Sequence, residues 1–168
     1  GSGFVMSERR DRQGVGRVLE LKVPPLLLFA LFAVAMFGLS WAAPATAFSL
    51  PGSRAAATLL ALSGLGIALA GVAAFRRHKT TVNPLVPSDA SSVVASGVYR
   101  HSRNPMYLGI LLLLAGWALF LSNTAAALLL PAFVAYMNRF QIAPEERILA
   151  AKFGAPFTDY TAAVRRWL

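Results

Sequence analysis

The chain has 168 residues with a mean hydropathy of +0.58, and 57% of them are hydrophobic while only 14% are charged. Soluble domains carry about 25% charged residues, so a soluble protein of this length could not bury so much apolar surface. We therefore expect a single-domain membrane protein. The net charge of +9 would be compatible with binding to nucleic acid. In a membrane protein, a simpler explanation is that basic loops lie on the cytoplasmic side and are attracted to anionic lipid headgroups. We therefore expect no nucleic-acid partner. The absence of cysteine excludes disulfides and thiolate chemistry.

The segment before the first apolar run is polar and basic. Gly1-Ser2-Gly3 is typical of a tag remnant, and Met6 is the expected native start. The rest of residues 1–22 is predicted to be a cytoplasmic arm or a short interfacial helix. A signal peptide is not expected, because the apolar run that follows is longer than the roughly 7–15 residues of its hydrophobic region.

Four uncharged apolar runs predict an all-α fold, an integral membrane bundle of four transmembrane helices arranged as two hairpins. A helix needs about 20 apolar residues to span the bilayer. The connections at 44–54 and 122–123 are rich in residues that favour turns. The predicted transmembrane helices are residues 23–43, 55–75, 105–121 and 124–138.

The basic residues are distributed unevenly among the connections. Lysine and arginine gather in the arm 1–22, in the loop 76–104 and from Arg139 onward, whereas the two hairpin turns contain only Arg54. By the positive-inside rule, both termini and the loop 76–104 face the cytoplasm, in what we expect to be a bacterial inner membrane. No residue with a full charge lies within the four apolar runs, which argues against an ion or proton transporter.

The segment Gly97–Tyr107 concentrates polar side chains directly before the third predicted span. Asn104 followed by Pro105 predicts a helix start, because asparagine is a favoured N-cap and proline fits the first helical position. The positive end of that helix, together with Arg100 and Arg103, would form an anion-binding site at the membrane boundary. The alternative is that these basic and aromatic residues are ordinary interface anchors.

The C-terminal segment 143–168 is predicted to be amphipathic and to lie at the cytoplasmic interface. Ala143-Pro144 is expected to open a helix whose first turn carries Glu145-Glu146, where the helix dipole favours acids. The alternative is that both acids are surface residues without a chemical role. The helix is predicted to break at Gly154-Ala155-Pro156, and a second short helix is predicted from Thr158 to Leu168.

Two sequence patterns resemble the signatures of one group of enzymes. The first, Tyr-Arg-x-x-Arg-Asn-Pro-Met-Tyr-x-Gly, begins at Tyr99, and the second, Glu-Glu-x-x-Leu-x-x-x-Phe-Gly-x-x-x-x-x-Tyr-x-x-x-Val, begins at Glu145. Both are similar to motifs of the isoprenylcysteine carboxyl methyltransferase and phospholipid methyltransferase families. Those families are integral membrane enzymes that use S-adenosyl-L-methionine and release S-adenosyl-L-homocysteine. The resemblance covers roughly residues 97–166, with a predicted two-span hairpin between the motifs.

The resemblance implies which residues form the site. The start of the third span with Arg103 would bind the cofactor carboxylate, and Glu145 or Glu146 would bind its ammonium or a ribose hydroxyl. Because aromatic faces attract cations, Tyr99 and Tyr107 would contact the sulfonium or the adenine. No metal is expected. The expected catalytic residues are Arg103, Asn104 and Glu146. The expected cofactor-binding residues are Tyr99, Arg100, His101, Arg103, Asn104, Pro105, Tyr107, Leu108, Gly109, Glu145 and Glu146.

The implied acceptor is a hydrophobic or lipid-like molecule that enters from the surrounding membrane lipids, without an obligate protein partner. Asn104 stands where the carboxyl methyltransferases usually have histidine, and it matches the phospholipid enzymes instead. Both an isoprenylcysteine-type carboxylate and phosphatidylethanolamine therefore stay open as acceptors; for an amine, His101 and the glutamates are the available bases. A different class, a non-enzymatic membrane accessory subunit, would share the composition but would not bind the cofactor.

Small residues in the second span leave two interpretations open. Gly64-Leu65-Gly66 resembles the Gly-x-Gly of phospholipid N-methyltransferases, which implies a cofactor contact, but small residues in membrane helices also serve close packing. The Ala- and Gly-rich surface of residues 55–75 would leave a groove for an acyl or prenyl chain. Bulky side chains at Gly66 or Ala70 are expected to obstruct that groove.

Overall fold

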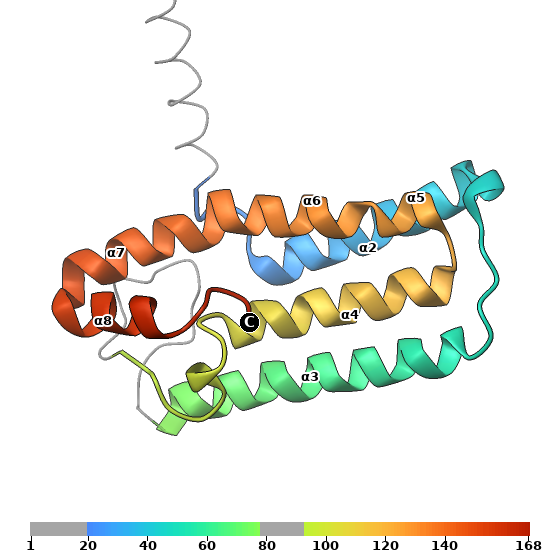
Figure 1. The fold of residues 1–168 in the computed structure, drawn as a ribbon. Helices are drawn as coiled ribbons and strands as arrows, with labels where there is room; N and C mark the ends of the chain where they lie inside the picture. The colour runs from blue at the N-terminus through green and yellow to red at the C-terminus, as the bar shows by residue number, and fades with distance from the viewer. Residues whose placement is uncertain (1–19, 78–92) are drawn as a thin grey trace, which may run out of the picture.

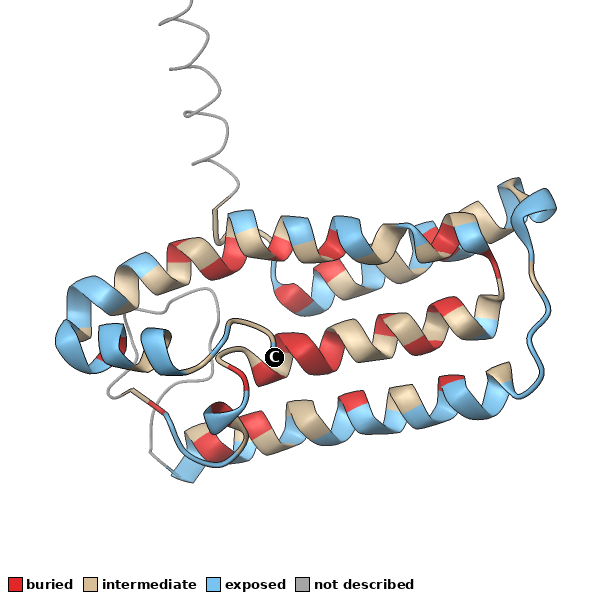
Figure 2. Cartoon of the chain, viewed as in Figure 1, coloured by how far each residue is buried: buried red, intermediate tan, exposed pale blue. Residues whose placement is uncertain are grey.

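The computed structural model describes residues 20–77 and 93–168. Long apolar helices lie side by side along one direction (Figure 1). The first two are α2 (Pro25–Ala42) and α3 (Ser53–Arg77). The third, α4 (Pro105–Leu121), packs against α3 along its length and also contacts α2. Buried residues are concentrated on α4, which is the central helix of the bundle (Figure 2).

These helices coincide with the first three predicted spans. α2 lies within the predicted 23–43, α3 extends the predicted 55–75 by two residues at each end, and α4 has the predicted bounds. Asn104 is the N-cap residue of α4 and Pro105 its first residue, because the fixed φ of proline suits the first helical turn. The predicted arm 1–22 and loop 76–104 lie partly outside the described residues.

The last predicted span and the first C-terminal helix are one helix of 30 residues, Thr124–Phe153. A separate helix opening at 143 was therefore wrong, although α-helical geometry resumes at Ala143. The predicted membrane boundary at 138 does not depend on a helix end and stays a prediction. The continuous helix comprises α5 (Thr124–Ala127), α6 (Leu129–Tyr136), the π-helical segment η4 (Met137–Ile142) and α7 (Ala143–Phe153).

A proline explains why a separate helix was predicted. Pro144 has no N–H to donate to the preceding turn, but the residues before it are π-helical, and the wider turn allows the helix to continue. Glu145 and Glu146 therefore lie inside a continuous helix and do not gain the expected benefit of a free N-terminus. At 1.5 Å per residue the helix is about 45 Å long, more than the roughly 30 Å of a hydrocarbon core, so one end must extend beyond it.

The chain reverses after α7. Gly154 has a φ of +64°, which glycine adopts without a steric penalty, and the predicted break is confirmed there. α8 (Ala155–Ala163) follows. The predicted continuation of the helix to Leu168 was wrong, because residues 164–168 leave the helix and lie beside the start of α4, where the letter C stands in Figure 1.

The two hairpin turns are joined to each other through Asn123. Its side-chain oxygen accepts the N–H of Ala126 at 3.0 Å and the hydroxyl of Thr46 at 3.1 Å, while its amide donates to the Ala43 carbonyl at 2.9 Å. Asn123 is buried, and these bonds satisfy its polar atoms. We call this the turn end of the bundle and the opposite end, where α3 stops and α4 begins, the motif end.

Among the described helices, α2, α3 and Thr124–Phe153 are long and apolar enough to cross a membrane. α4 is equally apolar but has only 17 residues, so the count of four spans stays a prediction. The outward faces carry large apolar side chains, as a lipid environment favours. The most exposed of those on α2, α3 and the long helix are Trp41, Leu26, Val34, Leu128, Leu59 and Leu62.

α3 and α4 approach each other through glycine. A Cβ atom built on Gly64 would lie 2.5 Å from the carbonyl oxygen of Gly109 and 2.9 Å from the Leu112 Cβ, whereas a Cβ on Gly66 would meet nothing within 4 Å. Gly64 therefore serves close helix packing. Gly66 lies on the exposed face of α3.

This difference predicts opposite effects for two neighbouring substitutions. Gly64→Ala is expected to lower the free energy of unfolding by about 1–3 kcal/mol, the usual cost of overpacking. The matched Gly66→Ala should be neutral or slightly stabilising, because alanine is the better helix former. Thermal unfolding of both variants in detergent measures this, and equal stability of the two would contradict the observed packing.

Candidate functional site at the motif end

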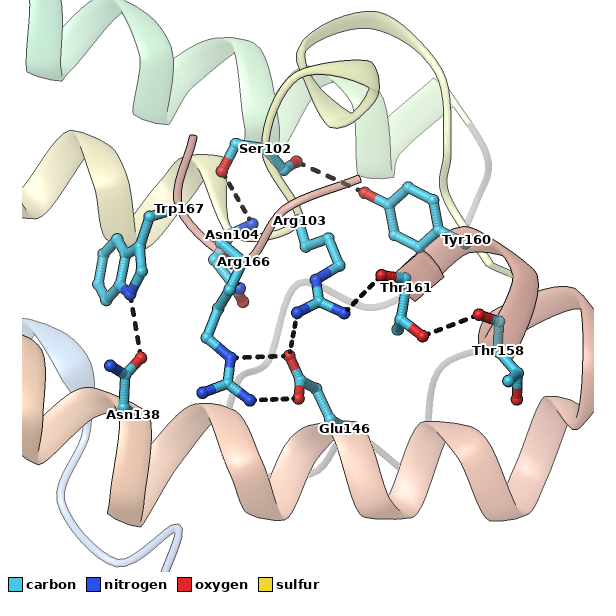
Figure 3. Close-up of polar contacts among 10 residues, drawn as sticks. All are labelled: Ser102, Arg103, Asn104, Asn138, Glu146, Thr158, Tyr160, Thr161, Arg166 and Trp167. Carbon is cyan, nitrogen blue, oxygen red and sulfur yellow. Dashed lines mark hydrogen bonds and ion pairs between the residues drawn. The ribbon is translucent and has the colours of Figure 1, made fainter. Parts of the chain in front are cut away.

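The two sequence motifs, far apart in the chain, meet at the motif end (Figure 3). The first motif runs through a short 3₁₀ helix, η3 (Gly97–Arg100), into the start of α4. The second motif begins on α7 and ends in the residues after α8. Residues 164–168 cross between them and contact both.

A carboxylate and two guanidinium groups form the centre of this region. Arg166 donates from Nε to Glu146 Oε1 at 3.1 Å and from Nη2 to Oε2 at 2.7 Å, so the contact is bidentate. Nη2 of Arg103 lies 3.3 Å from Oε1 of the same carboxylate. The side chains of Arg103 and Glu146 are only 14% and 22% exposed, which makes these contacts stronger than those of surface pairs.

Backbone contacts fix the residues 164–168 against the start of α4. The N–H of Arg103 donates to the Arg165 carbonyl at 3.0 Å, and the Asn104 side-chain amide donates to the Arg166 carbonyl at 2.9 Å. Asn104 therefore marks the helix start as predicted, but its side chain makes no capping bond. Its N–H is instead accepted by the Ser102 hydroxyl at 3.1 Å.

A second cluster joins α4 to the π-helical segment and α7. The Tyr107 hydroxyl and the Gln141 side-chain amide both donate to Oε1 of Glu145, and the same amide lies 3.3 Å from the Tyr107 oxygen. Tyr107 and Gln141 are buried, while Glu145 is partly buried. Glu145 thus has neutral partners where Glu146 has cationic ones.

A cavity of about 70 Å³ with aromatic walls lies beside these clusters. The Tyr160 hydroxyl donates to the Tyr99 carbonyl at 2.8 Å. Burial raises the pKa of Tyr160 well above its usual value, although Arg103 lowers it, and the phenol stays a donor at neutral pH. Burial, with smaller contributions from Tyr160 and Glu145, also raises the pKa of Tyr99. The lining residues are Phe75, Val93, Val94, Tyr99, Arg103, Leu149, Phe157 and Tyr160.

The structure brings six of the predicted site residues together at the motif end and leaves five apart from these contacts. Those together are Tyr99, Arg103, Asn104, Tyr107, Glu145 and Glu146. Arg100 and His101 are exposed. Pro105, Leu108 and Gly109 are buried within the bundle, and Gly109 packs against Gly64 of α3.

Several residues of the region were not among the predicted site residues. Arg166 and Gln141 lie outside the quoted motifs, and nothing in their local sequence marks them. Tyr160 is part of the second motif, so the motif itself could have identified it as a site residue. Trp167 donates to the Asn138 side chain at 3.0 Å and holds the end of the chain against the long helix.

Comparison with known proteins identifies the family of the chain. Residues 53–156 match the phospholipid methyltransferase family. An uncharacterized protein of Haemophilus influenzae is 48% identical over 63 residues, which are 38% of this chain and the full length of that protein. No solved structure matches the chain significantly. The family match spans more than half of the chain, including α3, α4 and the long helix with its two glutamates, and the chain belongs to the phospholipid methyltransferase family.

Proposed function

We propose that the protein transfers a methyl group from S-adenosyl-L-methionine to a hydrophobic or lipid-like acceptor at the motif end. The observation that carries the proposal is the contact of Glu146 with Arg103 and Arg166. It joins the first motif to the second in one polar region at the edge of an apolar bundle. Family membership supports methyl transfer, and the sequence resemblance supports S-adenosyl-L-methionine as the donor.

The side chains at the motif end fit the charged groups of this cofactor. S-adenosyl-L-methionine supplies a methyl group activated by a sulfonium, and it also carries a carboxylate and an ammonium. The Nε of Arg103 is buried and has no hydrogen-bond partner in the described part of the chain, so an anion would satisfy it. Glu145 suits the ammonium, and the rings of Tyr99 and Tyr160 offer faces to a cation. Glu146 orients Arg103 through their ion pair.

An acceptor from the lipid phase is supported by a lateral groove. The groove has a volume of about 470 Å³ and opens between α2, α3 and α4, nearer the turn end. Gly66 and Ala70, where a groove was expected, are not among its lining residues. These are Phe29, Ala33, Ala57, Thr58, Ala61, Leu113, Gly116, Trp117 and Phe120. The family match, together with Asn104 in the first motif, favours a phospholipid acceptor over an isoprenylcysteine carboxylate.

Binding of S-adenosyl-L-homocysteine separates this enzyme from a membrane accessory subunit. A ligand that binds only the folded state at a hundredfold excess over its Kd stabilises it by about 2.7 kcal/mol. We expect a concentration-dependent rise in the melting temperature of the purified protein in detergent. If saturating S-adenosyl-L-homocysteine causes no shift, and a direct titration detects no binding, the accessory-subunit interpretation is the better one.

The site is also proposed to face the cytoplasm, with both termini on the same side. The natural absence of cysteine allows single cysteines at Ser49, in the first turn, and at Ala95, before η3; both positions are exposed. In intact cells a membrane-impermeant maleimide is expected to label Ser49→Cys and not Ala95→Cys, whereas both should react after permeabilisation. The reverse pattern in intact cells would invert the topology.

A further inference from the structure

The adjacent glutamates of α7 have opposite electrostatic surroundings. Glu146 pairs with two guanidinium groups, whereas Glu145 makes no ion pair among the described residues and is held by a phenol and an amide. A partly buried carboxylate without a counter-charge is unfavourable. The surroundings of Glu145 are therefore incomplete in a way that a bound cation would correct.

The two neutral contacts leave one carboxylate oxygen available. The Tyr107 hydroxyl and the Gln141 amide both donate to Oε1 of Glu145. Oε2 receives no hydrogen bond from the described residues. An ionised carboxylate accepts bonds on both oxygens, so one oxygen is fixed by the protein while the other can bind a ligand. Leu149, one helical turn after Glu145, lines the aromatic cavity.

Gln141 has no packing reason to be polar. Its side chain is only 2% exposed, and its neighbours Met137 and Ile142 are completely buried apolar residues. Burial of an amide costs free energy unless its hydrogen bonds are satisfied. Gln141 lies four residues before Glu145, so the two side chains share a helix face, and the amide donates to Oε1 of Glu145.

We propose that Gln141 is a positioning residue that, together with Tyr107, holds Glu145 so that Oε2 binds a primary ammonium group. The inference rests on the proposed function, in which two ligands carry such a group: the amino-acid end of the cofactor and an amine headgroup of the acceptor. The chemistry is the same in both cases, a charge-assisted N–H···O bond.

Paired ligands with and without the amine test the inference. We would titrate wild type, Glu145→Gln and Gln141→Leu with S-adenosyl-L-homocysteine and its desamino analogue, and with phosphatidylethanolamine and phosphatidylglycerol in mixed micelles. Glu145→Gln is expected to weaken binding of the amine-bearing member of one pair by about ten- to hundredfold, the effect of losing one charge-assisted bond. Gln141→Leu removes only a bond to Glu145 and should weaken the same member by a smaller factor. The member without an amine should bind as in wild type. Selective loss in the first pair identifies the cofactor as the source, and selective loss in the second identifies the acceptor.

Tyrosine variants supply the control and a second route. Tyr107→Phe should weaken binding of the same amine-bearing ligand. If Gln141→Leu does not fold, Tyr107→Phe tests whether the bonds to Oε1 of Glu145 support that binding. Tyr136→Phe removes a hydroxyl from the same bundle, where the ring packs on Phe140, and should bind like wild type. Wild-type affinities in every variant, or equal losses for both members of each pair, would overturn the inference while leaving the proposed function intact. Wild-type protein that binds no S-adenosyl-L-homocysteine would contradict the proposed function and the inference with it.

Discussion

Replacement of Arg103 by lysine is expected to lower the rate of methyl transfer by about tenfold to hundredfold, although the positive charge is kept. Arginine presents a planar fork of donors, whereas lysine presents one ammonium. Arg103 uses the two ends of its fork separately, Nη2 on Glu146 and Nη1 on the Thr161 carbonyl, each at 3.3 Å. A lysine would keep one of these contacts at most, and a lost charge-assisted bond costs about 1.5–3 kcal/mol.

Arg100→Lys is the matched control for this prediction. Arg100 precedes Arg103 by three residues but is exposed on η3, so the exchange should leave the initial rate within about twofold of wild type, as surface changes usually do. Rates are compared in nanodiscs at saturating acceptor. An Arg103→Lys protein as active as Arg100→Lys would show that the forked contact has no part in the reaction.

The contact between Glu146 and Arg166 is expected to give a coupling free energy of about 1 kcal/mol or more in a double-mutant cycle. Glu146→Gln leaves two guanidinium groups without their carboxylate, and Arg166→Gln leaves Glu146 with Arg103 as its single cationic partner. Each should lower the free energy of unfolding by about 1.5–3 kcal/mol. The double variant should lose less than the sum. Glu146→Gln should also weaken S-adenosyl-L-homocysteine about tenfold to hundredfold, because Arg103 loses the group that orients it.

The same helix offers a control for this cycle. Arg147 pairs with Glu20 at 2.6 Å, but its side chain is 59% exposed, and exposed pairs contribute about 0–1 kcal/mol. Arg147→Gln should therefore leave both the stability and the cofactor affinity nearly unchanged. Additive losses from Glu146→Gln and Arg166→Gln, with wild-type affinity for S-adenosyl-L-homocysteine, would mean that Glu146 is a surface acid without a chemical role.

The parts of the fold that were predictable from the sequence are those fixed by local chemistry. Asn104 and Pro105 place the start of α4 because their conformational preferences act within one turn, and Gly154 places the reversal after α7 for the same reason. Pro144 suggested a separate helix, but its usual effect on a helix is offset by the π-helical turn before it. Residues 164–168 were misjudged because contacts with a distant helix start, which the local sequence does not reveal, draw them out of a helix.

The residues of the candidate site also fall into those that the sequence predicts and those that only the fold reveals. The order of residues in the two motifs predicts that Arg103 and Glu146 belong to one region, and the structure places them in contact. The sequence gives no comparable signal for Arg166 or Gln141, because each acquires its role through a partner whose position depends on the fold. The sequence pattern also treats Glu145 and Glu146 alike, and only their neighbours in space distinguish a carboxylate with cationic partners from one with neutral partners.

The most direct test of methyl transfer to lipid at the motif end follows the methyl group itself. Purified protein in nanodiscs of phosphatidylethanolamine and phosphatidylglycerol would be incubated with S-adenosyl-L-methionine labelled in its methyl group, and the products would be divided between organic and aqueous phases. We expect label to enter the organic phase with wild type and Arg100→Lys, and to enter it at least about tenfold more slowly with Arg103→Lys and Glu146→Gln. Label that stays in the aqueous phase, or that enters the lipid equally fast with all four proteins, would contradict a lipid methyltransferase with its site at the motif end.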